Sequence, residues 1–216
     1  MKKFLFLLFV TFLCHPFLAF ARPLKGFHKG PYLALEAGLL QANNDHDEQA
    51  GNDVGRDFEG AFGFLFGWNI SDPFAMELGG LYSTDFNVGR REHIVLTTVN
   101  GRYSFIFDAL ADFKYVHILP HLKVGATNRI LVLPGNTLSQ DQTVSTFAFG
   151  PSLTAGVSFL YHKYLSFGLD LREDFLFAES ARQNLENASP SLSNQLIYDG
   201  GFQPNFSAMF FFGVHY

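Results

Sequence analysis

The last eleven residues of the chain, 206–216, alternate strictly between two kinds of side chain. Counted back in steps of two from the C-terminus, one row is wholly apolar: Phe206, Ala208, Phe210, Phe212, Val214 and Tyr216. The other row is smaller or more polar, except at Phe211. A period of two residues indicates a β-strand whose two faces meet different surroundings. The segment therefore predicts a terminal strand with one apolar face, which needs further strands to pair with.

Seven further segments show strand patterns, and most divide into a bulky apolar row and a row of small or polar residues. The clearest is 58–70, where Phe62, Phe64, Phe66, Trp68 and Ile70 form the bulky row. The eight predicted strands cover residues 32–41, 58–70, 74–84, 92–105, 115–127, 143–159, 164–177 and 197–216. Short turns alternate with longer polar connections, so we expect loops at 43–57, 85–91, 128–142 and 178–196. Within the third loop, Ile130–Leu133 is apolar enough to extend the preceding strand.

The amino terminus has the features of an export signal. Hydrophobic residues make up 48% of the chain, yet no run after the first twenty residues reaches the length of a membrane-spanning helix. Lys2 and Lys3 precede an apolar run over 4–14, and Ala19-Phe20-Ala21 has the small-x-small pattern of a cleavage site. We therefore predict a signal peptide over 1–21 and one mature domain over 22–216. A retained anchor, or a lipoprotein signal attached at Cys14, is the alternative.

Cleavage after residue 21 would change the charge and the cysteine content. The mature chain would keep 13 basic and 20 acidic residues and would contain no cysteine, because Cys14 lies in the signal. A disulfide is then excluded. The excess of acid argues against nucleic acid as a partner.

The chain resembles the small eight-stranded bacterial outer-membrane β-barrels of the OmpA and OmpX type. We expect an all-β fold, an eight-stranded antiparallel up-and-down transmembrane β-barrel with both termini on the periplasmic side and the long loops outside. A lipocalin-like soluble barrel would hide its bulky row inside, whereas here the small and charged row fits a narrow lumen. In the family, a closing strand with a terminal aromatic is read by the insertion machinery. The resemblance assigns that role to Phe210, Phe212, Val214 and Tyr216.

Charged residues of the small row form the candidate site. The predicted lumen cluster is Glu36, Glu77, Arg102, Lys123, Asp170 and Arg172. Opposite charges in a lumen of low dielectric should pair across neighbouring strands, with Glu77 and Arg102 as one such pair. The cluster resembles the charged plug of OmpA-type barrels, so we expect a closed lumen. The alternative is a narrow channel for ions or small solutes; an OmpW-like carrier of apolar solutes would need an apolar lumen.

Other chemistry has weaker support in the sequence. The carboxylates of 45–57 lack the glycine and final glutamate of a calcium-binding loop, so we expect a solvated loop, with no metal and no cofactor. The His-x-Ser pair of the lipid A deacylase family is absent, and the histidines fall at predicted strand ends and turns, so we expect no catalytic residue. The resemblance implies a location in the outer membrane of a Gram-negative bacterium. Its partners would be outer-membrane lipids, lipopolysaccharide, the insertion machinery and, through the loops, host or envelope surface ligands.

Overall fold

The computed structural model describes residues 29–42, 58–84, 93–106, 116–133, 144–162, 164–179, 181–183, 195–198 and 200–216. Ten strands lie in these ranges: β1 (Gly30–Ala42), β2 (Glu59–Asn69), β3 (Phe74–Thr84), β4 (His93–Ser104), β5 (Val116–Leu133), β6 (Val144–Tyr161), β7 (Leu165–Ala178), β8 (Ala181–Gln183), β9 (Gln195–Tyr198) and β10 (Gly201–His215). No helix that could span a membrane occurs in these ranges. The predicted signal peptide and the acidic first loop lie outside the described residues.

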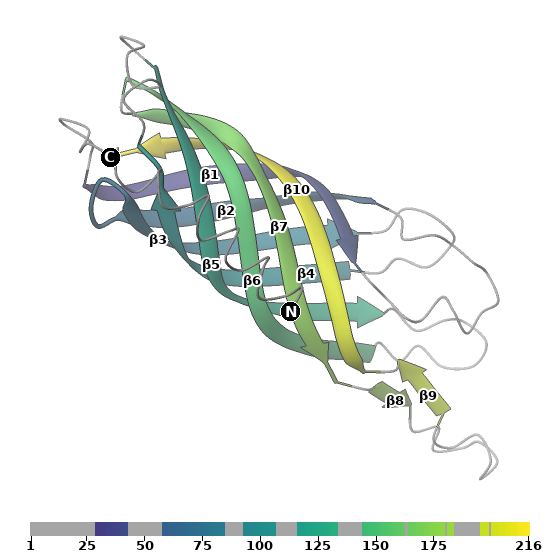
Figure 1. The fold of residues 1–216 in the computed structure, drawn as a ribbon. Coiled ribbons are helices and arrows are strands. Elements are labelled where there is room, and N and C mark those ends of the chain that lie inside the picture. The colour runs from purple at the N-terminus through teal and green to yellow at the C-terminus, as the bar shows by residue number, and fades with distance from the viewer. Residues whose placement is uncertain are drawn as a thin grey trace, which may run out of the picture.

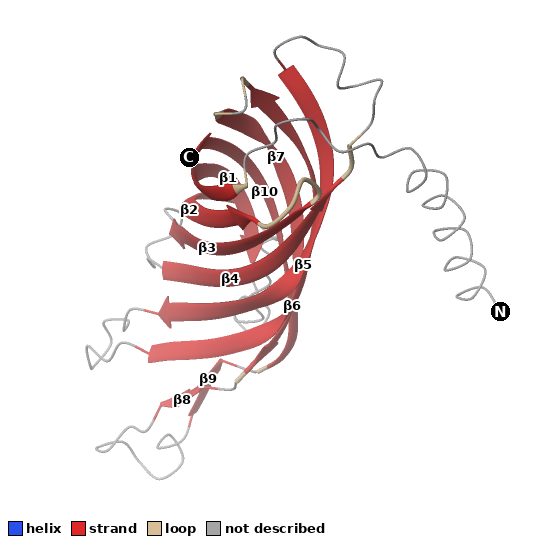
Figure 2. Ribbon diagram, turned by 90° about the vertical axis from the view of Figure 1, so that its left-hand side faces the viewer, coloured by secondary structure: helices blue, strands red, loops and turns tan. Residues whose placement is uncertain are grey.

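Eight of the strands close into one barrel. Each of β1 to β6 pairs antiparallel with the next, and β10 completes the circle by pairing with both β7 and β1 (Figure 1). β8 and β9 form a separate two-stranded sheet at one end of the barrel, opposite the end that holds the C-terminus (Figure 2). We call these the loop end and the terminal end. The predicted fold class, an eight-stranded up-and-down antiparallel barrel, is confirmed.

The strands are strongly tilted, as the register shows. Following paired residues from Tyr32 through Gly67, Glu77, Asn100, Gly125, Ser152, Asp174 and Asn205 returns to β1 at Ala42, ten residues beyond the start. An eight-stranded barrel with this stagger has an interior just wide enough to be filled by side chains. Residues from strands that are not neighbours in the sheet therefore meet across the lumen.

The two faces of the wall differ as the alternation predicts. The outer face carries large exposed apolar side chains on every barrel strand, such as Phe64, Leu78, Val124 and Phe210. The inner face carries buried glycine, alanine, serine, threonine, asparagine and most of the charged residues of these strands. A protein in water buries its apolar side chains, whereas this barrel places them outside.

Several predicted strand ends differ from the structure by one or two residues, as where β1 begins at Gly30 instead of residue 32, and three differences concern β5, β6 and the last strand. β5 runs to Leu133, so the loop expected from residue 128 starts later; Ile130–Leu133 extends the strand because it pairs with both β4 and β6. β6 runs two residues beyond its predicted end, to Tyr161. The last predicted strand, 197–216, is two strands, β9 and β10, and the loop predicted at 178–196 was wrong where it contains β8 and the start of β9. Gly201 is the first residue of β10 and has a φ of 135°, which a residue with a side chain rarely adopts.

The wall has one interruption, between β6 and β7. Register pairs continue up to Phe149 and Phe177 and resume at Ser152 and Asp174, so the pairing omits Gly150 and Pro151. Proline has no N–H to donate, which explains a break in the ladder within a strand that has neighbours on both sides.

Candidate functional site

Four charged side chains form the centre of the lumen. Arg102 of β4 and Lys123 of β5 are register partners, which brings two positive charges side by side. Glu77 of β3 lies against both: its Oε1 is 3.1 Å from Arg102 Nη1, and its Oε2 is 2.8 Å from Lys123 Nζ. Asp170 of β7 reaches Lys123 from the other side, with Oδ2 2.6 Å from Nζ. We call these four residues the central network; each carboxylate removes the repulsion that the adjacent cations would otherwise feel.

The central network continues into a histidine that the sequence analysis placed at a strand end or turn. His121 is buried in the lumen, and its Nε2 lies 2.7 Å from Asp170 Oδ1. Its Nδ1 lies 3.1 Å from the hydroxyl of Ser158 on β6. Gly156 of β6 faces this contact, and a Cβ there would lie 2.2 Å from Asp170 Oδ1 and 2.6 Å from His121 Nε2. The network therefore requires a residue without a side chain at this position.

Ser158, His121 and Asp170 follow one another in the order of a hydrolase triad. Such a triad acts only where a substrate can approach the hydroxyl. Ser158 is 6% exposed and His121 2% exposed, and the described lumen cavity is lined by Asp170 but by neither of the other two. Asp170 is also shared with Lys123, which gives it a structural partner besides the histidine. The arrangement does not support catalysis.

An aromatic layer closes the central network toward the terminal end. The hydroxyl of Tyr32 on β1 donates a hydrogen bond to Glu77 Oε1, and the Arg102 guanidinium lies over the Tyr32 ring, 4.9 Å from its centroid. On its other side Tyr32 stacks on His215, with ring centroids 4.8 Å apart. His215 Nε2 is 3.0 Å from the hydroxyl of Ser166 on β7. His215 is thus a second buried histidine, although it lies one residue from the C-terminus.

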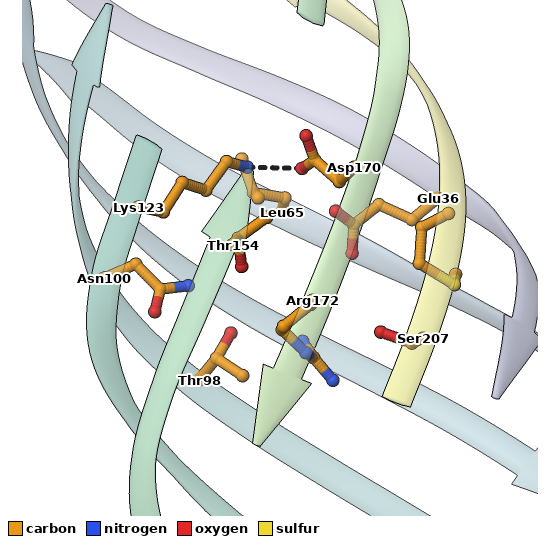
Figure 3. A pocket seen from close by; sticks show the side chains of 10 residues that line it. Glu36, Leu65, Thr98, Asn100, Lys123, Thr154, Asp170, Arg172 and Ser207 are labelled. Carbon is orange, nitrogen blue, oxygen red and sulfur yellow. Dashed lines mark ion pairs between the residues drawn. The ribbon is translucent and has the colours of Figure 1, made fainter. Parts of the chain in front are cut away.

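The two remaining members of the predicted cluster, Glu36 and Arg172, lie beside a small cavity. Arg172 Nε is 3.2 Å from Asp174 Oδ2 on the same strand, whereas Glu36 makes no ion pair with any described residue. Both line a cavity of about 20 Å³ next to Lys123 and Asp170 (Figure 3). That space holds about one water molecule. Arg172 Nη2 is buried with no hydrogen-bond partner in the protein, so such a water would have a donor to bind.

The loop-end half of the lumen contains an apolar layer that the sequence analysis missed. It consists of Leu40, Ala61, Leu81, Ile94, Leu96, Leu131 and Met209. Six of these seven are completely or almost completely buried, with exposures of 0 to 3%: Leu40, Leu81, Ile94, Leu96, Leu131 and Met209. The available signal was local loss of alternation, because Ile94-Val95-Leu96 is apolar in both rows. A run that is apolar in both rows indicates apolar surroundings on both faces of the strand: Ile94 and Leu96 are buried in the lumen, and Val95 is exposed on the outer face.

Beside the apolar layer lies a second polar group. Arg129 of β5 is completely buried; it donates to Asn205 Oδ1 at 3.0 Å and to Gln203 Oε1, both on β10. Thr127 donates to Asp174 Oδ1 at 2.7 Å. Arg129 was missed because residue 128 was expected to begin a loop. Its burial follows from the longer β5.

The C-terminal residues assigned to insertion lie on the outer face of β10. Phe210 is 69% exposed and Tyr216 72% exposed, and Phe212 and Val214 lie between them on the same side. Among the described residues, no group of three or more histidine, cysteine, aspartate or glutamate side chains is arranged to hold a metal ion.

Comparisons with known proteins support the architecture at low sequence identity. No protein-family model and no curated protein sequence matches the chain. Among solved structures, Neisserial surface protein A has a TM-score of 0.61 and 9% identity, over 87% of this chain and 97% of that one. The chain has the fold of the small eight-stranded outer-membrane β-barrels.

Two further structures share this barrel. The outer membrane protein OprG from Pseudomonas aeruginosa has a TM-score of 0.52 and 12% identity, over 87% of this chain and 96% of that one. Ail, the attachment invasion locus protein of Yersinia pestis, in complex with the heparin analogue sucrose octasulfate, has a TM-score of 0.50 and 10% identity, over 87% and 99%. At these identities the likeness concerns the fold.

Proposed function

We propose that this protein is an integral protein of a bacterial outer membrane, that its lumen is closed, and that it acts through the long loops at the loop end. One observation carries the proposal: the wall is apolar outside and the interior is filled by paired charges and packed side chains. Only a lipid surrounding removes the cost of so many exposed aromatic side chains. The predicted signal peptide agrees with export to that membrane.

The closed lumen rests on two barriers in series. The central network crosses the barrel from β3 to β7 through Lys123, and its charges have partners within hydrogen-bond distance. The apolar layer lies beyond the cavity, toward the loop end. An ion would have to break buried pairs and then cross a dry layer. This supports a structural or surface-interaction role for the loops, as the names of the Neisserial surface protein and of Ail suggest for those proteins.

A narrow ion channel is the second candidate, favoured by the cavity beside Lys123. The Lys123 ammonium is shared by two carboxylates, and Glu36 and Arg172 both line the cavity without a direct ion pair between them. If Lys123 exchanged its carboxylate partners at this cavity, a water-filled path would open through part of the lumen. The apolar layer alone gives no support to a carrier of apolar solutes, because its side chains pack against one another.

Conductance in a planar bilayer separates the two candidates. The refolded wild type is compared with Arg102→Ala and Lys123→Ala. We expect a silent wild type, and variants that stay silent as well, because the apolar layer remains packed when a cation of the central network is removed. Steady conductance of the wild type that the two variants alter would favour the channel and contradict the plug. A heat-dependent shift in gel mobility of the protein from an outer-membrane fraction tests the location; its absence would contradict a folded barrel in that membrane.

A further inference from the structure

One carboxylate of the barrel strands lies on the outer face of the wall instead of in the lumen. Of the aspartate, glutamate, lysine and arginine side chains on the eight barrel strands, Glu173 of β7 alone lies exposed on the outer face between apolar neighbours. The four cations of these strands, Arg102, Lys123, Arg129 and Arg172, are all buried in the lumen. Glu173 makes no ion pair with a described residue. The structure therefore places an unpaired negative charge on the surface that, under the proposed function, faces lipid.

The neighbours of Glu173 are apolar on every side. Along β7 they are Leu171 and Phe175, and across the sheet they are its register partners Leu153 of β6 and Phe206 of β10. Phe177 and Phe202 lie farther toward the loop end, with ring centroids 5.6 Å apart. Aromatic side chains thus separate Glu173 from the rim of the barrel. A charge in such a position is costly in lipid, and ionisable residues there commonly mark a functional contact.

Small side chains lie on both sides of Leu171, the outward neighbour of Glu173 toward the terminal end. Leu171 pairs with Ala155 of β6 and with Ala208 of β10. Pro151 lies near it on β6, at the interruption in the wall. We call Leu153, Ala155, Leu171, Glu173, Phe206 and Ala208 the Glu173 patch. The patch thus combines one exposed carboxylate with apolar side chains only.

We propose that the Glu173 patch is an interface for another membrane-embedded protein, which places a lysine or arginine side chain against the Glu173 carboxylate. Charge complementarity decides the kind of partner. A second copy across a two-fold axis would bring two Glu173 carboxylates together, and the barrel strands offer it no outward cation. Phe175 and Phe177 lie between Glu173 and the loop end of β7, so a headgroup amine at that rim would have to reach past two aromatic side chains. A lysine or arginine of a protein packed against the wall reaches Glu173 from the side, without crossing these rings.

The proposal rests on the proposed function, and two measurements separate their failures. The first uses purified barrel in phosphatidylcholine vesicles, where the partner is absent. Folding into the vesicles, followed by gel mobility, tests the membrane barrel itself. Glu173→Gln and Glu173→Leu should both raise the urea midpoint of unfolding, because each removes an unpaired charge from lipid. A lowered midpoint in both variants would mean that Glu173 is satisfied within the barrel, and would overturn the interface.

The second measurement uses a photo-crosslinking amino acid at Leu153 in cells that make the protein, with the same probe at Phe64 on another part of the outer wall as control. We expect a discrete adduct from position 153 alone, at least tenfold weaker in Glu173→Gln. Glu173→Lys should abolish the adduct, and exchanging the partner's contacting basic residue for glutamate should restore it. An adduct of twice the chain mass, an adduct unaffected by Glu173→Gln, or no adduct at all would overturn the proposal.

Discussion

Replacing Lys123 by methionine tests whether the lumen charges hold the barrel together. The ammonium lies 2.8 Å from Glu77 and 2.6 Å from Asp170, and the Lys123 side chain is 5% exposed. Methionine keeps most of the volume but leaves two buried carboxylates with one cationic partner fewer. Breaking a buried pair by removing one partner costs about 3–5 kcal/mol. Glu77 keeps Arg102 and Tyr32, and Asp170 keeps His121, so we expect a loss of about 3 kcal/mol, near the lower end of that range.

Urea unfolding in phospholipid vesicles measures this loss. Trp68 is the single tryptophan of the chain and lies exposed on the outer face, so its fluorescence reports whether the wall is in lipid. A double-mutant cycle with Asp170→Asn isolates the pair, because the double variant removes one charge of each sign. We expect the double variant to be more stable than the sum of the single losses by about 2 kcal/mol. A coupling below about 0.5 kcal/mol would refute the reasoning that these charges stabilise each other.

Three further changes have expected outcomes that the same unfolding assay checks. Gly156→Ala should destabilise the barrel by about 1–3 kcal/mol, because the added Cβ would collide with Asp170, His121 and the Leu169 carbonyl. Gly101→Ala is the control and should be neutral, because its Cβ would meet only one atom, at 3.9 Å; equal losses in the two variants would contradict the packing. Leu96→Ala in the apolar layer should cost about 2–5 kcal/mol, and a loss below about 1 kcal/mol would mean that this layer is not packed. Tyr216→Ser should reduce the yield of inserted barrel in cells while leaving refolding of the purified chain in vesicles nearly unchanged; an equal reduction in both would contradict a role in targeting.

The alternation of side chains predicted the fold well because a barrel wall has two sharply different surroundings. In β2 and β10 each aromatic predicted to face outward does so, and Glu77 and Arg102 are buried on the inner face. Side chains alternate between the two faces along a strand, so assigning one residue to a face assigns all the others in that strand. From Ile94 to Leu96 the parity still placed Val95 outside, but lumen and outer face are both apolar there, so the alternation did not reveal the apolar layer.

The contacts inside the lumen were beyond sequence reasoning for a geometric reason. Lys123 and Asp170 lie on β5 and β7, which are not paired with each other, and their meeting depends on the register of both strands with β6 between them. No single strand pattern reveals that register. His121 and His215 were misplaced for the same reason, since each finds its partners on other strands. Glu173 was readable from parity alone, as the one acid in the apolar row of β7.

The pairing of β1 with β10 joins the beginning of the barrel to its end, with Tyr32 opposite His215. This contact has the longest sequence separation in the sheet, and loop closure must be completed before it contributes any stability. A chain emerging amino terminus first has β1 without its second neighbour until the last strand arrives, and a chain that stops before β10 leaves two open edges ready to pair with other chains. The barrel therefore closes only when all eight of its strands are present. A truncated chain should aggregate rather than form a smaller barrel.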